Sequence, residues 1–254
     1  IFDPKNSVLH RILGKFINLT ADKVIVVSDA VQKNWDGLVS HHKICKIYNG
    51  IPLEKETMPS SSIREELKIS DEVVLLGMFG RVNRFKGQGY LLDIVHHLKE
   101  ITSNFHLVFA GDAFPGDESL YEDFVNRITE ENLNALVTNL GYRNDIPQIM
   151  ESLDIFILPS IKPDPFPTVL LEAMAASKPV IATFQGGAIE QVENGLTGNL
   201  IPLDNAKEAA SIIALLIGNK SLRESMGAHG NERLMSTFSL EAFEDNIHQL
   251  IEKI

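Results

Sequence analysis

The stretch VVLLGMFGRVNRFKGQGYL, residues 73–91, carries the signals of a strand, a turn and a helix in direct succession. Its apolar run 73–79 is long enough for a strand that is buried on both faces, and Gly80 then ends the run. Apolar residues at helical spacing follow directly after Gly87. This succession predicts a strand-to-helix unit of an α/β protein.

Two cations, Arg81 and Lys86, lie on the loop between that strand and that helix. Open α/β sheets bind ligands at the carboxyl ends of their strands, and two cations there can neutralise a diphosphate. The alternative is a solvated loop with ordinary basic residues, which this short pattern alone does not exclude.

A second informative stretch is KPDPFPTVLLEAMAASKPVIAT, residues 162–183. Its prolines disfavour helix before residue 168, so a helix is expected to begin at Thr168 and to be capped by that hydroxyl. The free N–H groups of a helix start attract anions, and Glu172 follows one turn later, where it can bind a pair of vicinal hydroxyls. The alternative is a capped helix with two solvated acids, Asp164 and Glu172.

The rest of the chain alternates between apolar runs and amphipathic stretches. Further strands are expected at 105–110, 136–139, 154–158, 179–182 and 198–201, with helices between them. The first residues predict a smaller unit: a helix over 8–19, a strand over 23–27, a helix over 29–38 capped by Ser28 or Asp29, a strand over 46–48 and a turn at 49–52. This alternation predicts a parallel, doubly wound sheet.

Seven segments follow one another in an order and spacing found in a known family. They are ADKVIVVSDAV (21–31), KIYNGI (46–51), GMFGRVNRFKG (77–87), LVFAGD (107–112), NLGYRNDIPQIMESLDIFILPS (139–160), DPFPTVLLEAMAASKPVIAT (164–183) and GGAIEQVENGLTGNLIP (186–202). The chain resembles, over essentially its whole length, the retaining glycosyltransferases of family 4, which have the GT-B fold. In that family's E-x7-E pattern Glu172 fills the second position, and Asp164, a shorter acid, fills the first.

This resemblance implies an α/β fold of GT-B type, in which a doubly wound, parallel, Rossmann-like sheet binds a nucleotide sugar. Residues 1–48 would be the last βα unit, a remnant of an N-terminal acceptor-binding domain that is mostly absent. Residues 49–238 would be the donor-binding domain, with the turn at 49–52 as the interdomain hinge. Residues 239–254 would form a C-terminal helix that packs back toward the N-terminal domain.

The resemblance also implies the roles of individual residues. The catalytic residues would be Arg81, Lys86, Asp164 and Glu172. The donor-binding residues would be Gly80, Arg81, Lys86, Tyr142, Arg143, Asp164, Phe166, Pro167, Thr168, Val169 and Glu172. Arg81 and Lys86 would bind the diphosphate and stabilise its growing charge.

The other contacts divide between the parts of the donor. Thr168 and Val169 would bind the phosphates, and Glu172 would bind the ribose hydroxyls. Tyr142 and Arg143 would lie beside the base. Asp164 and the backbone of Phe166 would contact the transferred sugar.

The activity implied in this way is transfer of a hexose-type sugar from a nucleotide sugar to a glycan or lipid-linked acceptor, with retention, in bacterial polysaccharide biosynthesis. UDP is the expected carrier and GDP the second choice. No cofactor and no metal are expected, because the sequence has no D-x-D motif for a metal–diphosphate complex. The single cysteine, Cys45, offers neither a disulfide nor a zinc site within the chain, which fits a reducing compartment.

Two alternatives stay open. A complete enzyme of this type needs roughly 350 residues or more, whereas this chain has 254 and begins at Ile1. The chain alone is therefore expected to be inactive, and it can equally be a donor-binding module without turnover, including a natural single-domain protein. A GT-B type nucleotide-sugar epimerase is disfavoured by the order of the seven segments.

Net charge and hydropathy limit the classes of partner and the cellular locations that the sequence favours. A net charge of −11 argues against nucleic acid. The longest apolar run, around 212–217, is too short to span a bilayer, and no signal peptide is visible. We expect a cytoplasmic protein, with peripheral contact at the inner face of the membrane through the absent domain as an option.

Overall fold

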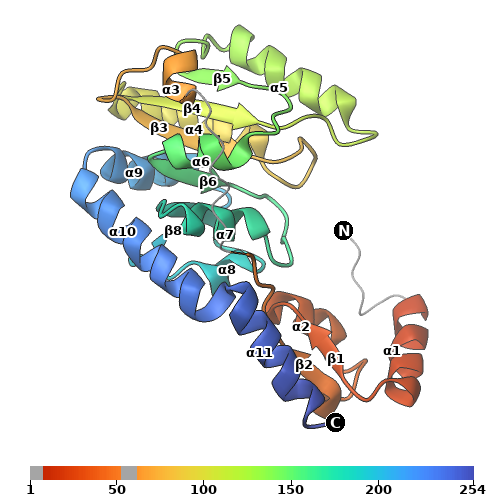
Figure 1. Ribbon diagram of the computed structural model, residues 1–254. Helices are drawn as coiled ribbons and strands as arrows, with labels where there is room; N and C mark the ends of the chain where they lie inside the picture. The colour runs from red at the N-terminus through yellow and green to blue at the C-terminus, as the bar shows by residue number, and fades with distance from the viewer. Residues whose placement is uncertain (1–7, 53–61) are drawn as a thin grey trace.

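The computed structural model describes residues 8–52 and 62–254. Its centre is a sheet of six parallel strands in the order β5-β4-β3-β6-β7-β8 (Figure 1). The strands are β3 (Val74–Phe79), β4 (Phe105–Ala110), β5 (Val137–Asn139), β6 (Ile155–Leu158), β7 (Val180–Thr183) and β8 (Gly198–Ile201). Each lies within one residue of its expected bounds, and the predicted parallel, doubly wound sheet is confirmed.

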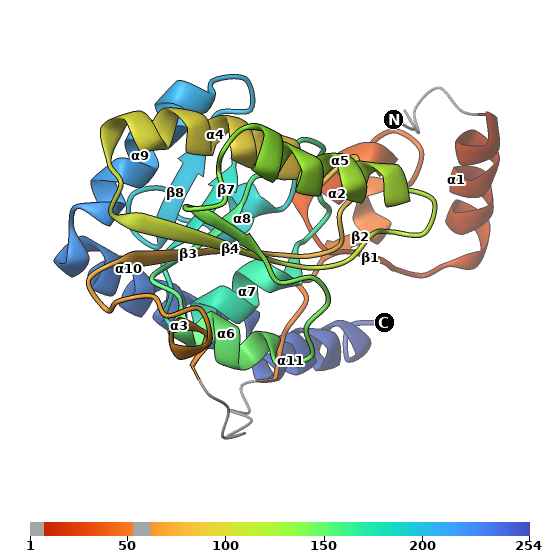
Figure 2. The ribbon, with the colours of Figure 1, turned by 90° about the horizontal axis from the view of Figure 1, so that it is seen from above.

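Helices connect these strands and cover both faces of the sheet, as Figure 2 shows with the sheet nearly edge-on. They are α3 (Ile63–Glu66), α4 (Gln88–Ile101), α5 (Glu118–Glu130), α6 (Ile146–Ser152), α7 (Thr168–Ala175), α8 (Ala188–Gln191), α9 (Ala206–Ile217) and α10 (Lys220–Arg233), followed by the π-helix η3 (Leu234–Phe238). Leu76 and Met78 of β3 pack in a core with α4, α5 and α9, whereas Leu75 packs in a second core with α6, α7 and η3. Successive strand residues point to opposite faces, so both cores require an apolar run.

The order of the strands reverses next to β3. From β3 the chain adds β4 and β5 on one side, and then returns to place β6 on the other side, where Leu76 pairs with Ile155. In open α/β sheets such a reversal opens a crevice at the carboxyl ends of the strands. The loops that follow β3 and β6, at 80–87 and 159–167, are therefore brought to the same edge.

The first described residues form a separate small unit, which we call the N-terminal unit (residues 8–48). It contains α1 (Val8–Thr20), β1 (Val24–Val26), α2 (Asp29–Trp35), the 3-10 turn η2 (His41–Lys43) and β2 (Ile44–Lys46). Its two strands pair in parallel, with Val24 opposite Ile44. Ser28 caps α2 by accepting a hydrogen bond from Val31 N.

Two details of this unit differ from expectation. The second strand, expected at 46–48, lies at Ile44–Lys46, because the apolar residues that directly follow η2 pair with β1. The helix expected over 29–38 ends at Trp35, because Asp36, with φ −58° and ψ 124°, leaves the helical conformation and Gly37 has a φ of +76°.

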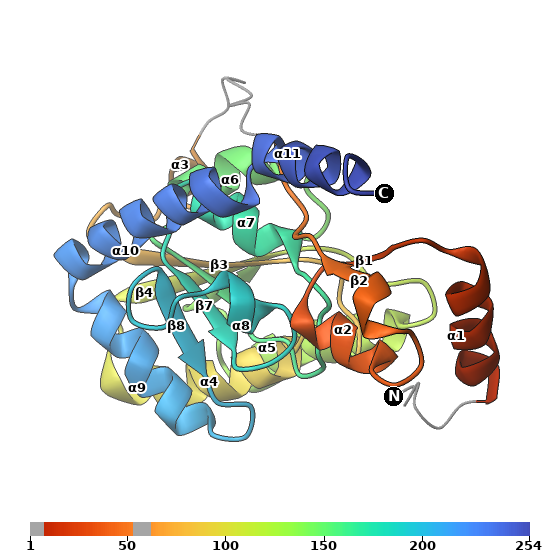
Figure 3. The ribbon, with the colours of Figure 1, turned by 90° about the horizontal axis from the view of Figure 1, so that it is seen from below.

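The chain leaves the N-terminal unit beside the start of α11 (Leu240–Ile251), which Figure 3 shows from below. Ile51 N donates to the Phe238 carbonyl, and Leu240 N donates to the Ile51 carbonyl. A Cβ on Gly50 would lie 2.4 Å from the carbonyl oxygen of Ser239, so this crossing needs glycine.

The division at residues 48 and 238 stays a prediction. Residues 1–7 and 53–61, which fall in the first and second predicted parts, lie outside the described residues. None of the residues of α11 is buried, so its predicted packing toward the N-terminal domain also stays a prediction. Within 8–52 and 62–254, no helix has the length and apolarity that crossing a bilayer requires.

Candidate functional site

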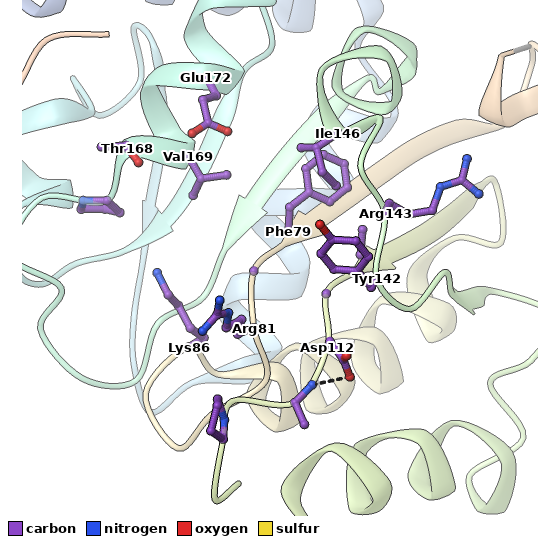
Figure 4. Close-up of a pocket in the computed structure, with 16 residues that line it drawn as sticks. Phe79, Arg81, Lys86, Asp112, Tyr142, Arg143, Ile146, Thr168, Val169 and Glu172 are labelled. Carbon is purple, nitrogen blue, oxygen red and sulfur yellow. Dashed lines mark hydrogen bonds between the residues drawn. The ribbon is translucent and has the colours of Figure 1, made fainter. Parts of the chain in front are cut away.

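A cleft of about 560 Å³ opens at the carboxyl ends of β3 and β4, with the start of α7 as its opposite wall (Figure 4). Nine of the eleven predicted donor-binding residues line it: Gly80, Arg81, Lys86, Tyr142, Arg143, Pro167, Thr168, Val169 and Glu172. The structure therefore brings together residues that are up to 92 positions apart in the chain, as Gly80 and Glu172 are.

Two glycines form the floor of the cleft. Gly80 and Gly111 follow β3 and β4 with φ values of +141° and +158°. A Cβ on Gly111 would lie 2.1 Å from the Gly80 carbonyl oxygen, so the two strand ends can approach this closely only because residue 111 has no side chain. The two loops then continue side by side, because Val82 N donates to the Asp112 carbonyl and Phe114 N donates to the Val82 carbonyl.

The two cations of the loop after β3 have different surroundings. Arg81 is exposed, and its guanidinium lies over the Phe114 ring at 5.9 Å from the centroid. No carboxylate lies within salt-bridge distance of Arg81 in the described part of the chain. Lys86 Nζ, in contrast, donates to Asp164 Oδ2 at 2.8 Å. One cation is thus open to a ligand, and the other is already paired with an acid.

The opposite wall is the start of α7. Thr168 is the first helical residue and Pro167 is the N-cap, with φ −68° and ψ 107° and no side-chain capping bond. The prediction that the Thr168 hydroxyl caps the helix is therefore wrong, because the proline already occupies the extended position before the first turn. The N–H groups of Thr168 and Val169 have no partner within the helix and remain at the cleft wall.

Glu172 lies one turn further along the same face of α7. The neighbouring Leu170 and Leu171 are fully buried, so the helix turns only Thr168, Val169 and Glu172 toward the cleft. Burial raises the pKa of the Glu172 carboxyl, although its side chain stays open to the cleft. Figure 4 shows Thr168 and Glu172 across the cleft from Tyr142, Phe79 and Ile146, with Arg81 and Lys86 below.

Tyr142 and Arg143 lie on the third side. The Tyr142 side chain is 76% exposed, so its ring is free to stack on a flat ligand. Arg143 bonds to Asp145 and Glu66 at 2.6 and 3.0 Å, and these bonds raise its pKa and lower that of Asp145. The guanidinium of Arg143 points away from Lys86 and Glu172 (Figure 4). Arg143 thus already holds two acids at the edge of the cleft.

The other two predicted residues lie outside this cleft. Asp164 lines a smaller recess of about 230 Å³, and Lys86 borders both spaces. Phe166 is buried, and its ring stacks on Tyr48 with 5.5 Å between centroids. The backbone N–H of Phe166 donates to Asp164 Oδ1 at 3.3 Å. The Lys86–Asp164 ion pair therefore separates the cleft from the recess.

Some lining residues had no predicted role in donor binding. They are Phe79, Ala110, Gly111, Asp112, Ala113, Pro115 and Ile146. Most follow directly on β3 or β4, so the rule that ligands bind at the carboxyl ends of parallel strands could have found them. Asp112 is exposed on the cleft wall, where its Oδ1 accepts a hydrogen bond from Ala113 N. In residues 8–52 and 62–254 no group of three or more His, Cys, Asp or Glu side chains is placed to hold a metal ion.

A doubly wound parallel sheet with a cleft between two basic side chains and a helix start is the arrangement in which many α/β proteins bind nucleotides. Within that class the chain belongs to the family "Glycosyl transferases group 1", whose model matches residues 59–233.

Proteins with similar sequences are also glycosyltransferases by name, which supports this family assignment. The chain is 29% identical to the uncharacterized glycosyltransferase MJ1178 of Methanocaldococcus jannaschii, over 98% of this chain and 65% of MJ1178. It is 26% identical to the capsular polysaccharide biosynthesis glycosyltransferase CapM of Staphylococcus aureus, over 97% of this chain and 65% of CapM. The chain thus spans slightly less than two thirds of the length of these relatives.

A solved structure extends the likeness to the fold. The crystal structure of Anabaena HepE in complex with UDP-glucose matches with a TM-score of 0.86 and 28% identity, over 99% of this chain and 70% of HepE. The fold is of the GT-B type, as the sequence predicts.

Proposed function

We propose that this chain is the donor-binding part of a retaining glycosyltransferase of family 4 and that it binds a UDP-sugar in the cleft. One observation carries the proposal: Arg81 and Lys86 lie across the cleft from the start of α7, so cations and helix N–H groups converge on one space. The group 1 family and the UDP-glucose bound to HepE support it.

The diphosphate would lie between these groups. Arg81 offers an unpaired guanidinium, and Lys86 has three N–H donors, so it can keep its bond to Asp164 while it reaches a phosphate oxygen. As the bond between the sugar and the diphosphate breaks, negative charge grows on the leaving oxygen. Fixed cations and N–H dipoles lower the energy of that transition state without a metal ion.

The nucleoside would extend along the other two walls. The carboxylate of Glu172 can accept hydrogen bonds from both ribose hydroxyls, which also satisfies an acid that burial otherwise disfavours as an anion. The exposed ring of Tyr142 can stack on the base. Arg143, held by Asp145 and Glu66, would keep the rim in place.

The transferred sugar would lie at the Lys86–Asp164 pair, where the cleft meets the recess. Asp164 and the Phe166 backbone would contact its hydroxyls. In a retaining reaction the acceptor oxygen bonds to the anomeric carbon on the face from which the diphosphate leaves. The acceptor proton then passes to the leaving diphosphate oxygen, so the step needs no protein nucleophile.

The acceptor and the whole reaction are further parts of the proposal. CapM is named for capsular polysaccharide biosynthesis, which supports a glycan acceptor. A lipid-linked acceptor and a cytoplasmic reaction at or near the membrane complete the proposal. The chain spans 65% of CapM, and this coverage favours a second candidate for the chain alone, a donor-binding module without turnover.

Titration calorimetry with UDP in the presence of EDTA tests donor binding. We expect saturable binding of one UDP per chain, with GDP weaker. Absence of binding by either nucleotide would refute the proposed function, and binding that appears only when a divalent metal is added would refute its metal-free form.

A further inference from the structure

The turn at residues 164–167, which we call the donor turn, is held by two other parts of the chain. Its two prolines have no N–H group, so it cannot form a regular backbone ladder of its own. Helix α8 holds one side: Gly187 N donates to the Asp164 carbonyl at 2.8 Å. Gln191 Nε2 donates to the Pro167 carbonyl at 3.1 Å. A Cβ on Gly187 would lie 2.2 Å from the Pro165 carbonyl oxygen, so the contact admits no side chain.

The N-terminal unit holds the other side through Ser28. Ser28 Oγ donates to the Pro165 carbonyl at 2.7 Å, and the same oxygen accepts from Val31 N at 3.2 Å as the cap of α2. A serine hydroxyl has one proton to donate, and here that proton is committed to the donor turn. Ser28 is 0% exposed, so water cannot readily replace this bond when it is removed.

Glu190 joins α8 to the same N-terminal unit. Its Oε1 accepts from Asp29 N at 2.7 Å. Its Oε2 accepts from Lys46 Nζ and Tyr48 Oη at 3.0 and 3.1 Å. The Glu190 side chain is only 12% exposed, and the Tyr48 ring also stacks on Phe166 of the donor turn. The elements on both sides of the donor turn are thus bonded to each other as well.

We propose that Ser28 and Glu190 are positioning residues for the transferred sugar. Neither lines the cleft, and both act through the donor turn, whose Asp164 would contact that sugar. The placement of Asp164 would then depend on the N-terminal unit, while the diphosphate contacts of Arg81 and Lys86 would not. This inference rests on the proposed function and adds to it a link between the N-terminal unit and sugar recognition.

The positioning role is tested by comparing how each variant changes the affinity for UDP-glucose and the affinity for UDP. The affinities of the 254-residue chain for UDP and UDP-glucose are measured by calorimetry for the wild type, Ser28→Ala and Glu190→Gln. We expect Ser28→Ala to weaken UDP-glucose about threefold to tenfold, the loss of one buried hydrogen bond, and UDP less than twofold. Glu190→Gln keeps the volume but removes the charge that faces Lys46, so it should act in the same direction.

Two matched variants separate positioning from stability. Asn219→Ala removes the side-chain cap from α10, and Glu131→Gln breaks the ion pair with Arg127 on α5, so both changes lie outside the donor turn, α8 and the cleft lining. Both can lower the melting temperature, but neither should change the ratio of the two affinities. If Ser28→Ala does not fold, Glu190→Gln gives the same reading.

Each result decides the inference. A ratio that changes in Ser28→Ala or Glu190→Gln and stays constant in the controls supports it. A wild-type chain that binds both ligands, with the same ratio in all variants, overturns the positioning role and leaves the proposed function intact. A wild-type chain that binds neither ligand overturns both.

Discussion

Replacing Lys86 by alanine is expected to weaken UDP binding more than replacing Arg81, because the two cations leave different groups behind. Lys86 Nζ bonds to Asp164 at 2.8 Å, and the two side chains are 24% and 25% exposed. Arg81 has no such acid within the described residues and lies over Phe114 instead. Only the loss of Lys86 therefore leaves an uncompensated carboxylate beside the site of the diphosphate.

The magnitudes follow from these contacts. Each cation should contribute about 1.5–3 kcal/mol, the range for a charge-assisted hydrogen bond, which is roughly tenfold to 150-fold in affinity. Two like charges about 6 Å apart repel by about 0.7 kcal/mol in bulk water and about 3 kcal/mol at an effective dielectric constant of 20. Because Asp164 is partly exposed, we expect an additional loss of about 1–2 kcal/mol for Lys86→Ala.

Calorimetry with UDP and EDTA measures both effects. We expect Lys86→Ala to bind most weakly, and the double variant Lys86→Ala, Asp164→Asn to recover about tenfold of that loss. Arg84→Ala is the matched control, because Arg84 lies on the same loop but bonds to Asp117 at 3.0 Å and does not line the cleft. Unchanged affinity in both single variants would refute the site, and a double variant no better than Lys86→Ala would refute the role of the ion pair.

Three further predictions concern the acids and turnover. Glu172→Gln should weaken UDP and UDP-glucose alike, whereas Asp164→Asn should weaken UDP-glucose relative to UDP; equal losses in titrations of the Asp164 variant would show that this carboxylate does not touch the sugar. Burial raises the pKa of Glu172, so the folded protein holds that proton more tightly than the unfolded chain does. The wild type should therefore lose stability relative to Glu172→Gln as the pH rises from about 4 toward 7. A difference in melting temperature between the two proteins that stays constant over this pH range would contradict a raised pKa of Glu172. A protein that also contains the acceptor-binding domain should transfer sugar with retention, whereas the 254-residue chain should bind donor and transfer poorly; NMR of the anomeric centre reads the outcome, and an inverted product would exclude family 4.

The large sheet could be predicted because most of its strands can be recognised from a short stretch of apolar sequence alone. Strands buried on both faces need uninterrupted apolar runs, and β3 has all six of its residues buried. The short strand β2 was misplaced by two residues, because Lys46 interrupts the apolar residues around Cys45 and the remaining pattern fits several positions.

The residues of the cleft could be named from the sequence, but their contacts could not. Lys86 and Asp164 are 78 positions apart, and Ser28 and Pro165 are 137 apart, so no local pattern indicates that they bond. The helix start was placed correctly at Thr168, yet the sequence favoured a hydroxyl cap over the extended Pro167. Contacts between loops depend on the final position of whole elements, which propensities do not encode.

The position of β3 in the sheet has a consequence for how the chain folds. The strands β3, β4 and β5 are consecutive and can pair as soon as they are synthesised, but β6 reaches β3 only after nearly eighty residues have been added. The half of the sheet that is synthesised first, β3 to β5, carries Arg81 and Lys86. The half that is synthesised later, β6 to β8, carries the start of α7. The proposed nucleotide site needs both halves, so a nucleotide that binds there would bind only to chains in which the two halves have joined, and it would favour the folded state by mass action.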